Sequence, residues 1–560
     1  MSRRVAVVGA GSSGLACMKC CLDEGLEPVC FESSDDIGGL WRFKENPEPD
    51  RASIYNSLII NTSKEMMCYS DFPIPAHFPN FMHNSLILDY FRMYADHFQL
   101  TKHIRLHTRV VNIKRRSDFS RSGQWDVETE NKDGKKEKHI FDAVMICIGH
   151  HCHPHLPLHD FPGSIETFKG EYFHSRDYKT PEQWRNKKVV VIGIGNSGGD
   201  IAVELSRFAK QVYLSTRRGA WILHRVGDNG IPLDLLLNRM TNLLQHILPS
   251  DYVSSIVENQ LNSRVNHALY SLKPKHRVFS QHPTVNDDLP NRILSGTVQV
   301  KPNIRRFHGS SVEFDDGSVV DDVDLVVFAT GYKFSFPFLA SNVVPVTDNY
   351  ASLYKFVFPP DLDRPTLAII GLVQPLGAIM PISEMQARWA TRVFKGKLGC
   401  IKLPSLSTMQ RDIQCKQEAM AKRYVTSQRH TIQVDYMDYM DEIANLVGVR
   451  PRVSRLLLTD PRLGLNLLFG PCTPYQYRLR GPGKWAGARK AILTQWERVF
   501  QPLQTRPGKD PERRRSLKLP LLLSAAAVGL AAYYNRSSLP AFLQDPAALL
   551  DRVKSSLPTQ

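Results

Sequence analysis

Two short glycine-rich patterns constrain the fold of this chain more than any other feature. Residues 9–14 read Gly-Ala-Gly-Ser-Ser-Gly after the apolar residues 5–8, and residues 193–198 read Gly-Ile-Gly-Asn-Ser-Gly after Lys188 and the apolar residues 189–192. Each is followed by a helix-like stretch and a second apolar run, at 13–24 and 28–31 for the first and at 199–210 and 211–214 for the second. In such a unit the glycines allow a tight turn, close approach of a pyrophosphate and close helix packing. The sequence therefore predicts an α/β fold with two Rossmann-like dinucleotide-binding domains.

The residues that end each unit distinguish the two nucleotides. Glu32 lies 23 residues after Gly9 and can accept hydrogen bonds from ribose hydroxyls. Residues 215–218 of the second unit read Ser-Thr-Arg-Arg, and guanidinium groups bind phosphate bidentately. Arg217 is preferred over Arg218 because it is nearer the strand end, although either arginine alone could be a solvated surface charge. We expect an adenine dinucleotide at the first site and NADP rather than NAD at the second.

Two dinucleotide sites in one chain indicate an electron relay, because a flavin is the usual acceptor of a nicotinamide hydride. A disulfide reductase would need a redox-active cysteine pair, but the only Cys-x-x-Cys, Cys17 to Cys20, follows the first glycine pattern on its helix. We interpret this pair as core packing. The net charge of +16 favours an anionic partner, yet no basic motif with interleaved aromatic residues supports nucleic-acid binding. We also expect no metal site, since no ligand cluster is evident.

Residues 168–178 carry a motif that identifies a family. They read Phe-Lys-Gly-Glu-Tyr-Phe-His-Ser-Arg-Asp-Tyr between the two glycine patterns and resemble the FxGxxxHxxxY motif of class B flavoprotein monooxygenases. Further segments look like motifs of this family: Gly-Gly-Leu-Trp at 38–41, Asn-Thr-Ser-Lys-Glu-Met at 61–66 and Phe-Ala-Thr-Gly-Tyr at 328–332. The chain is similar to the mammalian microsomal flavin-containing monooxygenases to about residue 496. Residues 219–223 and 280–284 look most like the fifth-isoform branch.

The resemblance implies a cycle in which NADPH reduces FAD, oxidised NADP stays bound, and reduced flavin captures oxygen as a 4a-hydroperoxide. Such an adduct survives where water is excluded and fixed donors hold its polar atoms. Asn61 matches the family residue beside the flavin, and its amide supplies both a donor and an acceptor, so it is the expected catalytic residue. Gln374 resembles a position at the flavin edge. His282 is expected to shape the substrate cavity, although a lone histidine is more often structural.

The residues expected to bind FAD or NADP come from the glycine patterns, the ends of their second strands and the family motifs. They are Gly9, Gly11, Ser13, Gly14, Glu32, Gly39, Leu40, Trp41, Asn61, Thr62, Gly193, Gly195, Asn196, Ser197, Gly198, Ser215, Thr216, Arg217 and Gln374. Further apolar runs at 143–148, 325–329 and 367–370 have the composition of buried parallel strands. A helical pattern at 235–248 belongs to a segment between the second unit and its later strands.

The expected domains are discontinuous. They are an FAD-binding domain at 1–154 and 331–445, an NADP-binding domain at 155–214 and 294–330, a mainly helical insertion at 215–293 that shapes substrate access, a C-terminal region at 446–505, a basic linker at 506–518, a hydrophobic membrane anchor at 519–534 and a tail at 535–560.

The apolar segment 519–534 carries no charge and would span about 24 Å as a helix. A buried core helix is the alternative, because a full span takes about 20 residues. Basic residues precede the segment, which predicts that the enzyme body faces the cytosol. The family resemblance implies the endoplasmic reticulum membrane.

The expected substrates are small lipophilic compounds, together with molecular oxygen. Resemblance to the fifth-isoform branch favours Baeyer–Villiger oxidation of ketones and aldehydes to esters. The alternatives are N- or S-oxygenation of soft nucleophiles, an NADPH oxidase that releases hydrogen peroxide, and a nucleotide-binding protein without turnover. Whether the chain forms a homo-oligomer is left open.

Overall fold

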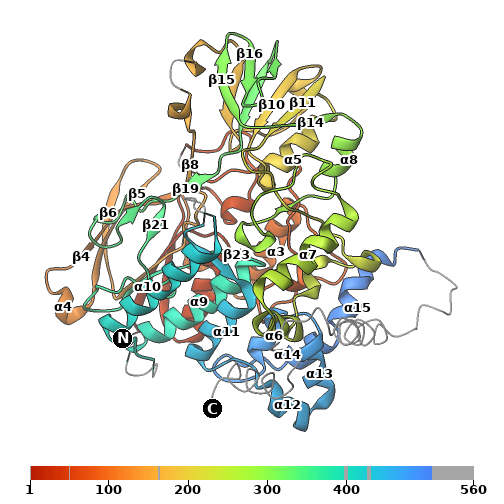
Figure 1. Cartoon of the computed structure of the whole chain (residues 1–560). Coiled ribbons are helices and arrows are strands. Elements are labelled where there is room, and N and C mark those ends of the chain that lie inside the picture. The colour runs from red at the N-terminus through yellow and green to blue at the C-terminus, as the bar shows by residue number, and fades with distance from the viewer. Residues whose placement is uncertain (1, 50, 162–163, 397–400, 426–429, 507–560) are drawn as a thin grey trace.

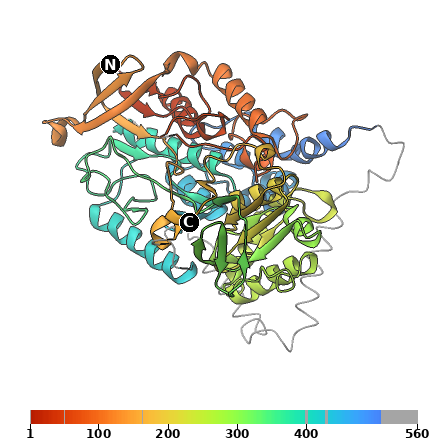
Figure 2. The same cartoon turned by 90° about the horizontal axis from the view of Figure 1, so that it is seen from above.

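The computed structural model describes residues 2–506, apart from residues 50, 162–163, 397–400 and 426–429. The chain forms two lobes, each built on a five-stranded sheet (Figure 1). The yellow and green lobe is at the top of this view, and the lobe with red, orange and teal segments lies below it. The view from above shows the same two bodies side by side (Figure 2).

The first sheet is entirely parallel, in the order β22-β7-β1-β2-β3. Its strands are β1 (Arg4–Val8), β2 (Glu27–Phe31), β3 (Ile104–Arg105), β7 (Ala143–Ile146) and β22 (Leu367–Ile369). Helix α1 (Ser12–Asp23) connects β1 to β2, which confirms the first predicted unit. Because β22 comes from a point in the chain after the whole second sheet, the chain leaves this lobe and later returns to complete it.

The second sheet is also parallel, in the order β14-β11-β10-β18-β9. Its strands are β9 (Glu171–His174), β10 (Lys188–Ile192), β11 (Gln211–Ser215), β14 (Val298–Lys301) and β18 (Leu325–Phe328). Helix α5 (Asn196–Leu205) connects β10 to β11. The unit is therefore confirmed, but its helix lies earlier in the chain than the predicted range 199–210.

Smaller sheets extend both lobes. They are the antiparallel sheet β4 (Thr108–Arg115), β5 (Trp125–Asn131) and β6 (Lys136–Phe141), the antiparallel sheet β15 (Ile304–His308), β16 (Ser311–Phe314) and β17 (Val319–Val320), and the pairs β8 (His153–Pro154) with β19 (Tyr332–Lys333), β12 (Ile222–Leu223) with β13 (Thr284–Val285), β20 (Val346–Thr347) with β21 (Tyr350–Ala351), and β23 (Gln374–Leu376) with β24 (Gln433–Asp435). The β8–β19 pair joins the two chain passages between the lobes.

The insertion between β11 and β14 contributes α6 (Arg239–Ile247), α7 (Ser250–Arg264) and α8 (Leu289–Leu294). The predicted helix at 235–248 was wrong at its start, because Asn238 caps the helix one residue before Arg239. The Asn238 Oδ1 accepts a hydrogen bond from the Thr241 backbone N–H at 2.8 Å. Residues 233–236 instead form a separate 3₁₀ turn.

The remaining helices belong to the lower lobe. They are α2 (Lys64–Met67), α3 (Asn84–His97), α4 (Phe119–Ser122), α9 (Ile379–Phe394), α10 (Leu406–Arg423), α11 (Tyr436–Val447), α12 (Val453–Thr459), α13 (Pro461–Phe469), α14 (Ala488–Leu493) and α15 (Gln495–Phe500). Helix α9 is almost wholly buried and packs against α1. Cys17 and Cys20 are buried on α1, which confirms that they pack in the core.

The predicted membrane segment at 519–534 and the tail at 535–560 lie outside the described residues, as does nearly all of the basic linker. Within the described part of the chain, no helix is both long enough and apolar enough to cross a bilayer.

Candidate functional site

The backbone of the first glycine loop is hydrogen-bonded to Glu32, the acidic residue that follows β2. Gly9 has a φ of +99°, a conformation that favours glycine, and it places the loop above the end of β1. The Ala10 N–H donates to Glu32 Oε2 at 2.8 Å, and the Ser34 N–H donates to Glu32 Oε1 at 2.9 Å. Glu32 Oε2 keeps a further lone pair and can still accept from a ribose hydroxyl, whereas Oε1 also accepts from the Ser33 hydroxyl at 3.5 Å.

The first glycine loop packs closely against residues 38–41, because glycine meets glycine there. A Cβ on Gly39 would lie 3.1 Å from the Gly11 Cα, so a side chain at Gly39 would push the two segments apart. Leu40 and Trp41 follow on a short 3₁₀ turn and are half-buried. The Ser13 hydroxyl already has a partner within the protein, because it donates to Ser383 Oγ on α9 at 3.0 Å.

The second glycine loop repeats this geometry with basic surroundings. Gly193 has a φ of +101°, and a cavity of about 180 Å³ lies beside it. This cavity is lined by Gly193, Gly195, Ser215, Thr216, Arg217 and Arg218. Both arginine side chains are exposed and form no ion pair within the described part of the chain. They are available to a phosphate, whereas the Ser215 hydroxyl already donates to the Pro302 carbonyl at 2.8 Å.

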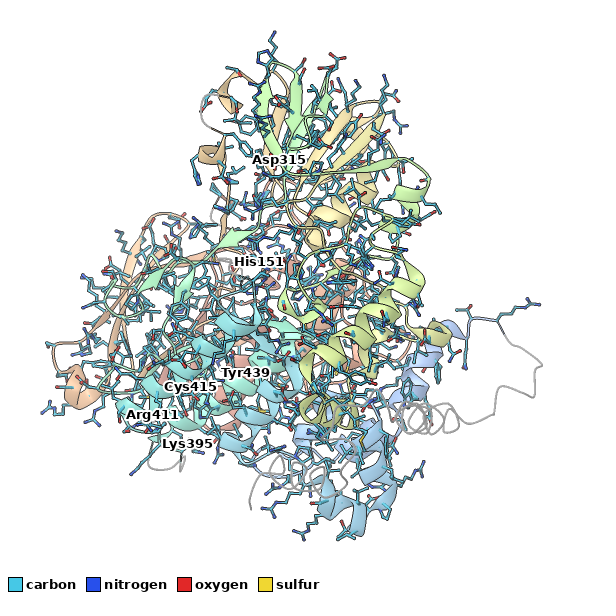
Figure 3. The ribbon with its side chains drawn as sticks, viewed as in Figure 1. His151, Asp315, Lys395, Arg411, Cys415 and Tyr439 are labelled. Atoms are coloured by element: carbon cyan, nitrogen blue, oxygen red, sulfur yellow. The ribbon has the colours of Figure 1, made fainter. Side chains whose placement is uncertain are left out.

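A second cavity, of about 150 Å³, gathers residues predicted from three separate segments. It is lined by Gly195, Asn196, Ser197 and Gly198 of the second loop, by His282 of the insertion and by Gln374 of β23. The Asn196 Oδ1 accepts from the Val285 N–H at 2.9 Å, which ties the loop to the insertion. His151 also lines the cavity and lies where the two lobes meet (Figure 3).

Asn61 lies against the insertion. Its Oδ1 accepts a hydrogen bond from Arg225 Nη2 at 2.6 Å. Asp287 orients the arginine, because its carboxylate accepts from Arg225 Nη1 at 3.1 Å and from the Arg225 backbone N–H at 2.9 Å. The Arg225 Nε is buried and donates to no acceptor in the described part of the chain. A buried donor of this kind is costly unless a further acceptor occupies the space beside it.

The insertion also binds the backbone that follows Asn61. The Ser63 N–H donates to Asp234 Oδ2 at 2.7 Å. Burial raises the pKa of the Asp234 carboxyl to about 6, because a charged group loses hydration there. Asn61 and the half-buried Thr62 are therefore held by the insertion on both sides.

Several residues at this site were not found from the sequence. They are His150, Arg225, Asp234, Asp287 and Gln433. Burial lowers the pKa of His150 to about 4, which keeps the imidazole neutral beside the second loop. Gln433 pairs with Gln374 across β23 and β24. Arg225 lies two residues after the 219–223 segment, and that position is the one signal that could have drawn attention to it.

Comparison with known proteins places this geometry in context. The model of a family described as flavin-binding monooxygenase-like matches residues 2–534. The chain is 61% identical to rabbit (Oryctolagus cuniculus) flavin-containing monooxygenase 5, covering 95% of this chain and 99% of the relative. It is 52% identical to dimethylaniline monooxygenase [N-oxide-forming] 2 of Cavia porcellus, covering 95% and 99%. Among solved structures, S-allyl-L-cysteine S-oxygenase from Allium sativum is 26% identical, with a TM-score of 0.61 over 89% of this chain and 99% of the other.

Proposed function

The chain belongs to the flavin-binding monooxygenase-like family, and on this premise we propose that it oxidises small lipophilic ketones and aldehydes to esters by Baeyer–Villiger chemistry. It is an FAD-containing, NADPH-dependent monooxygenase. In the proposed reaction, ketone, O2, NADPH and one proton become ester, NADP⁺ and water. One oxygen atom enters the carbon–carbon bond beside the carbonyl, and the other leaves as water.

The glycine loops fit the two cofactors. The first glycine loop, with Glu32 beside it, would hold FAD, and the cavity beside Gly193 with Arg217 would hold NADPH. Bound FAD supplies the transfer of electrons from NADPH to oxygen. The protein's own part is to orient both nucleotides, exclude water and place charge where the substrate reacts.

The contact between Arg225 and Asn61 is the observation that favours Baeyer–Villiger oxidation over heteroatom oxygenation. Addition of an oxygen nucleophile to a carbonyl places negative charge on the carbonyl oxygen, and a fixed guanidinium stabilises such charge strongly in a poorly hydrated site. The 2.6 Å hydrogen bond to Asn61 and the unpaired buried Nε put this donor beside the expected catalytic amide. Transfer of electrophilic oxygen to sulfur or nitrogen needs no stabilised oxyanion on the substrate.

The test is the ratio of hydrogen peroxide released to NADPH consumed by full-length, FAD-loaded protein in detergent with a linear ketone. We expect a ratio well below one, with ester accounting for the remainder. A ratio near one with every ketone would contradict the proposal and indicate an NADPH oxidase.

N- or S-oxygenation is the second candidate, because two of the relatives above are named for N-oxide formation and S-oxygenation. A thioether assayed beside the ketone separates the two chemistries. Sulfoxide without ester would favour this alternative.

Arg217 is expected to select NADPH over NADH. Arg217→Ala removes a guanidinium from the cavity beside Gly193, and charge-assisted hydrogen bonds contribute about 1.5–3 kcal/mol. The KM for NADPH should therefore rise about 10- to 100-fold while the KM for NADH stays nearly constant. Steady-state kinetics with both nucleotides measure this, and Arg218→Ala is the matched comparison. Equal changes for NADPH and NADH would show that Arg217 does not bind the 2′-phosphate.

We also propose that residues 519–534 attach the enzyme to the endoplasmic reticulum membrane, with the body facing the cytosol. The support is the uncharged composition of the segment and the basic residues that precede it. The domain boundaries expected from the sequence are also proposed here. The return of the chain to complete the first sheet at β22 supports the discontinuous first domain.

A further inference from the structure

Two wide outer cavities lie on the side of the lower lobe that faces the insertion. One has a volume of about 880 Å³ and is lined by α6, α10 and α11, including Leu243, Met420 and Met437. The other, of about 540 Å³, is lined by α6, α7 and the segment before His282, including Val253 and Phe279. Both are large enough for small organic molecules.

A narrow apolar slot lies between these outer cavities and the site. Its volume is only about 50 Å³, and its walls include Leu223, Val257, Phe279 and Leu376. The slot shares His282 and Gln433 with the 150 Å³ cavity at the second glycine loop. The cavities therefore form a series that leads from the outer volume to the cavity at the second glycine loop.

Arg423 stands where the outer cavities meet the slot. Among the described residues, it alone lines both outer cavities and the slot. It is the last residue of α10, and its Nη1 and Nη2 donate to the two carboxylate oxygens of Asp435 at the end of β24. Its Nε donates to the Phe279 carbonyl of the insertion at 3.4 Å. One side chain thus joins α10, β24 and the segment that carries His282.

The Arg423–Asp435 ion pair is in contact with water, which allows it to open. The two side chains are 37% and 35% exposed, so water can replace the partner of each charge when the pair opens. The backbone nearby is fixed separately, because the Val425 N–H donates to the Ser280 carbonyl at 3.0 Å. The arginine can therefore swing away while the end of α10 stays in place.

We propose that Arg423 and Asp435 form the throat of the substrate route and that Arg423 determines which molecules pass. With the throat closed, the 50 Å³ slot admits slender, neutral, lipophilic molecules. Bulky molecules pass only when the ion pair is open. Charged molecules are disfavoured because they lose hydration in the apolar slot. This inference rests on the proposed function in taking the substrate to be a neutral lipophilic compound.

The test compares Arg423→Ala with Lys422→Ala in full-length, FAD-loaded protein. Lys422 precedes Arg423 on α10 and lines only the 540 Å³ cavity, so its replacement removes the same charge without touching the throat. The first readout is kcat/KM for a slender and a bulky substrate, with one such pair of ketones and one pair of thioethers. The second is quenching of bound-flavin fluorescence by acrylamide with NADP present, which needs no turnover. Asp435→Asn, which keeps the side-chain shape, serves as a second throat variant.

We expect Arg423→Ala to raise kcat/KM for the bulky member of a pair about 10-fold relative to the slender one, and to raise the quenching constant about twofold. Asp435→Asn should change both in the same direction, and Lys422→Ala should change neither. Unchanged ratios and quenching in both throat variants, or equal changes in Lys422→Ala, would overturn the throat. If only thioethers react, the proposed ketone chemistry fails, while the thioether ratio and the quenching still decide the throat.

Discussion

Asn61→Ala protein will bind FAD and accept electrons from NADPH at nearly the parental rate, yet it will form oxygenated product about 10²- to 10³-fold more slowly. A rate loss of this size is typical when one fixed hydrogen-bond donor is removed from a site where charge develops in the transition state. The substitution also leaves Arg225 Nη2 without its 2.6 Å acceptor, so the guanidinium loses part of its orientation. NADPH consumption should continue, with the lost product replaced by hydrogen peroxide.

Two companion variants make this result specific. Asn56→Ala changes an exposed asparagine five residues earlier and should leave both rates unchanged. Asn61→Asp keeps the side-chain shape and the acceptor for Arg225 but removes the amide donor. Product formation at the parental rate in Asn61→Asp would show that the amide donor is not needed, whereas slow formation would trace the effect to the lost donor and the new charge beside Arg225. If Asn61→Ala made product at the parental rate, Asn61 would have no catalytic role.

The parts of the fold that the sequence predicted are those that local pattern determines. The strands β18 and β22 are continuous apolar runs, and β1 and β10 are apolar after their first residue, as buried parallel strands require. The start of α5 was missed because its first turn contains the glycines of the fingerprint, which have low helix propensity. The start of α6 was missed because leucines precede it, although Asn238 followed by Thr241 was a readable capping signal.

The parts of the site that could not be predicted are contacts between distant segments. Arg225 and Asn61 are 164 positions apart and meet only because the insertion folds back onto the first lobe. Asp234 contacts Ser63 across 171 positions for the same reason. The composition of the insertion indicates helices but not the loop against which they pack. Sequence motifs therefore predict where the nucleotides bind, and tertiary packing determines which charges reach the reacting centre.

Gly198→Ala should slow hydride transfer from NADPH about 100-fold while leaving FAD bound. A Cβ at this position would overlap the Gly193 carbonyl oxygen, which is backbone and cannot rotate away. Helix α5 would have to move from the end of β10, so the loop would lose the close approach that a pyrophosphate needs. Forced overpacking of this kind costs about 1–3 kcal/mol or more, so the second-order rate of flavin reduction should fall about 100-fold.

Gly199→Ala is the matched control for Gly198→Ala, because the two glycines are adjacent on α5 and both are buried. A Cβ at Gly199 would meet Thr284 Cγ2 at 3.4 Å, an ordinary van der Waals contact, and alanine favours a helix by about 1 kcal/mol over glycine. This variant should reduce flavin at the parental rate and unfold at an equal or higher temperature. Anaerobic stopped-flow absorbance of the flavin measures reduction, and the yellow colour of the purified protein reports FAD. Equal reduction rates in the two variants would contradict the assignment of this loop to NADPH. Loss of FAD from Gly198→Ala would instead mean that the two lobes do not bind their nucleotides independently.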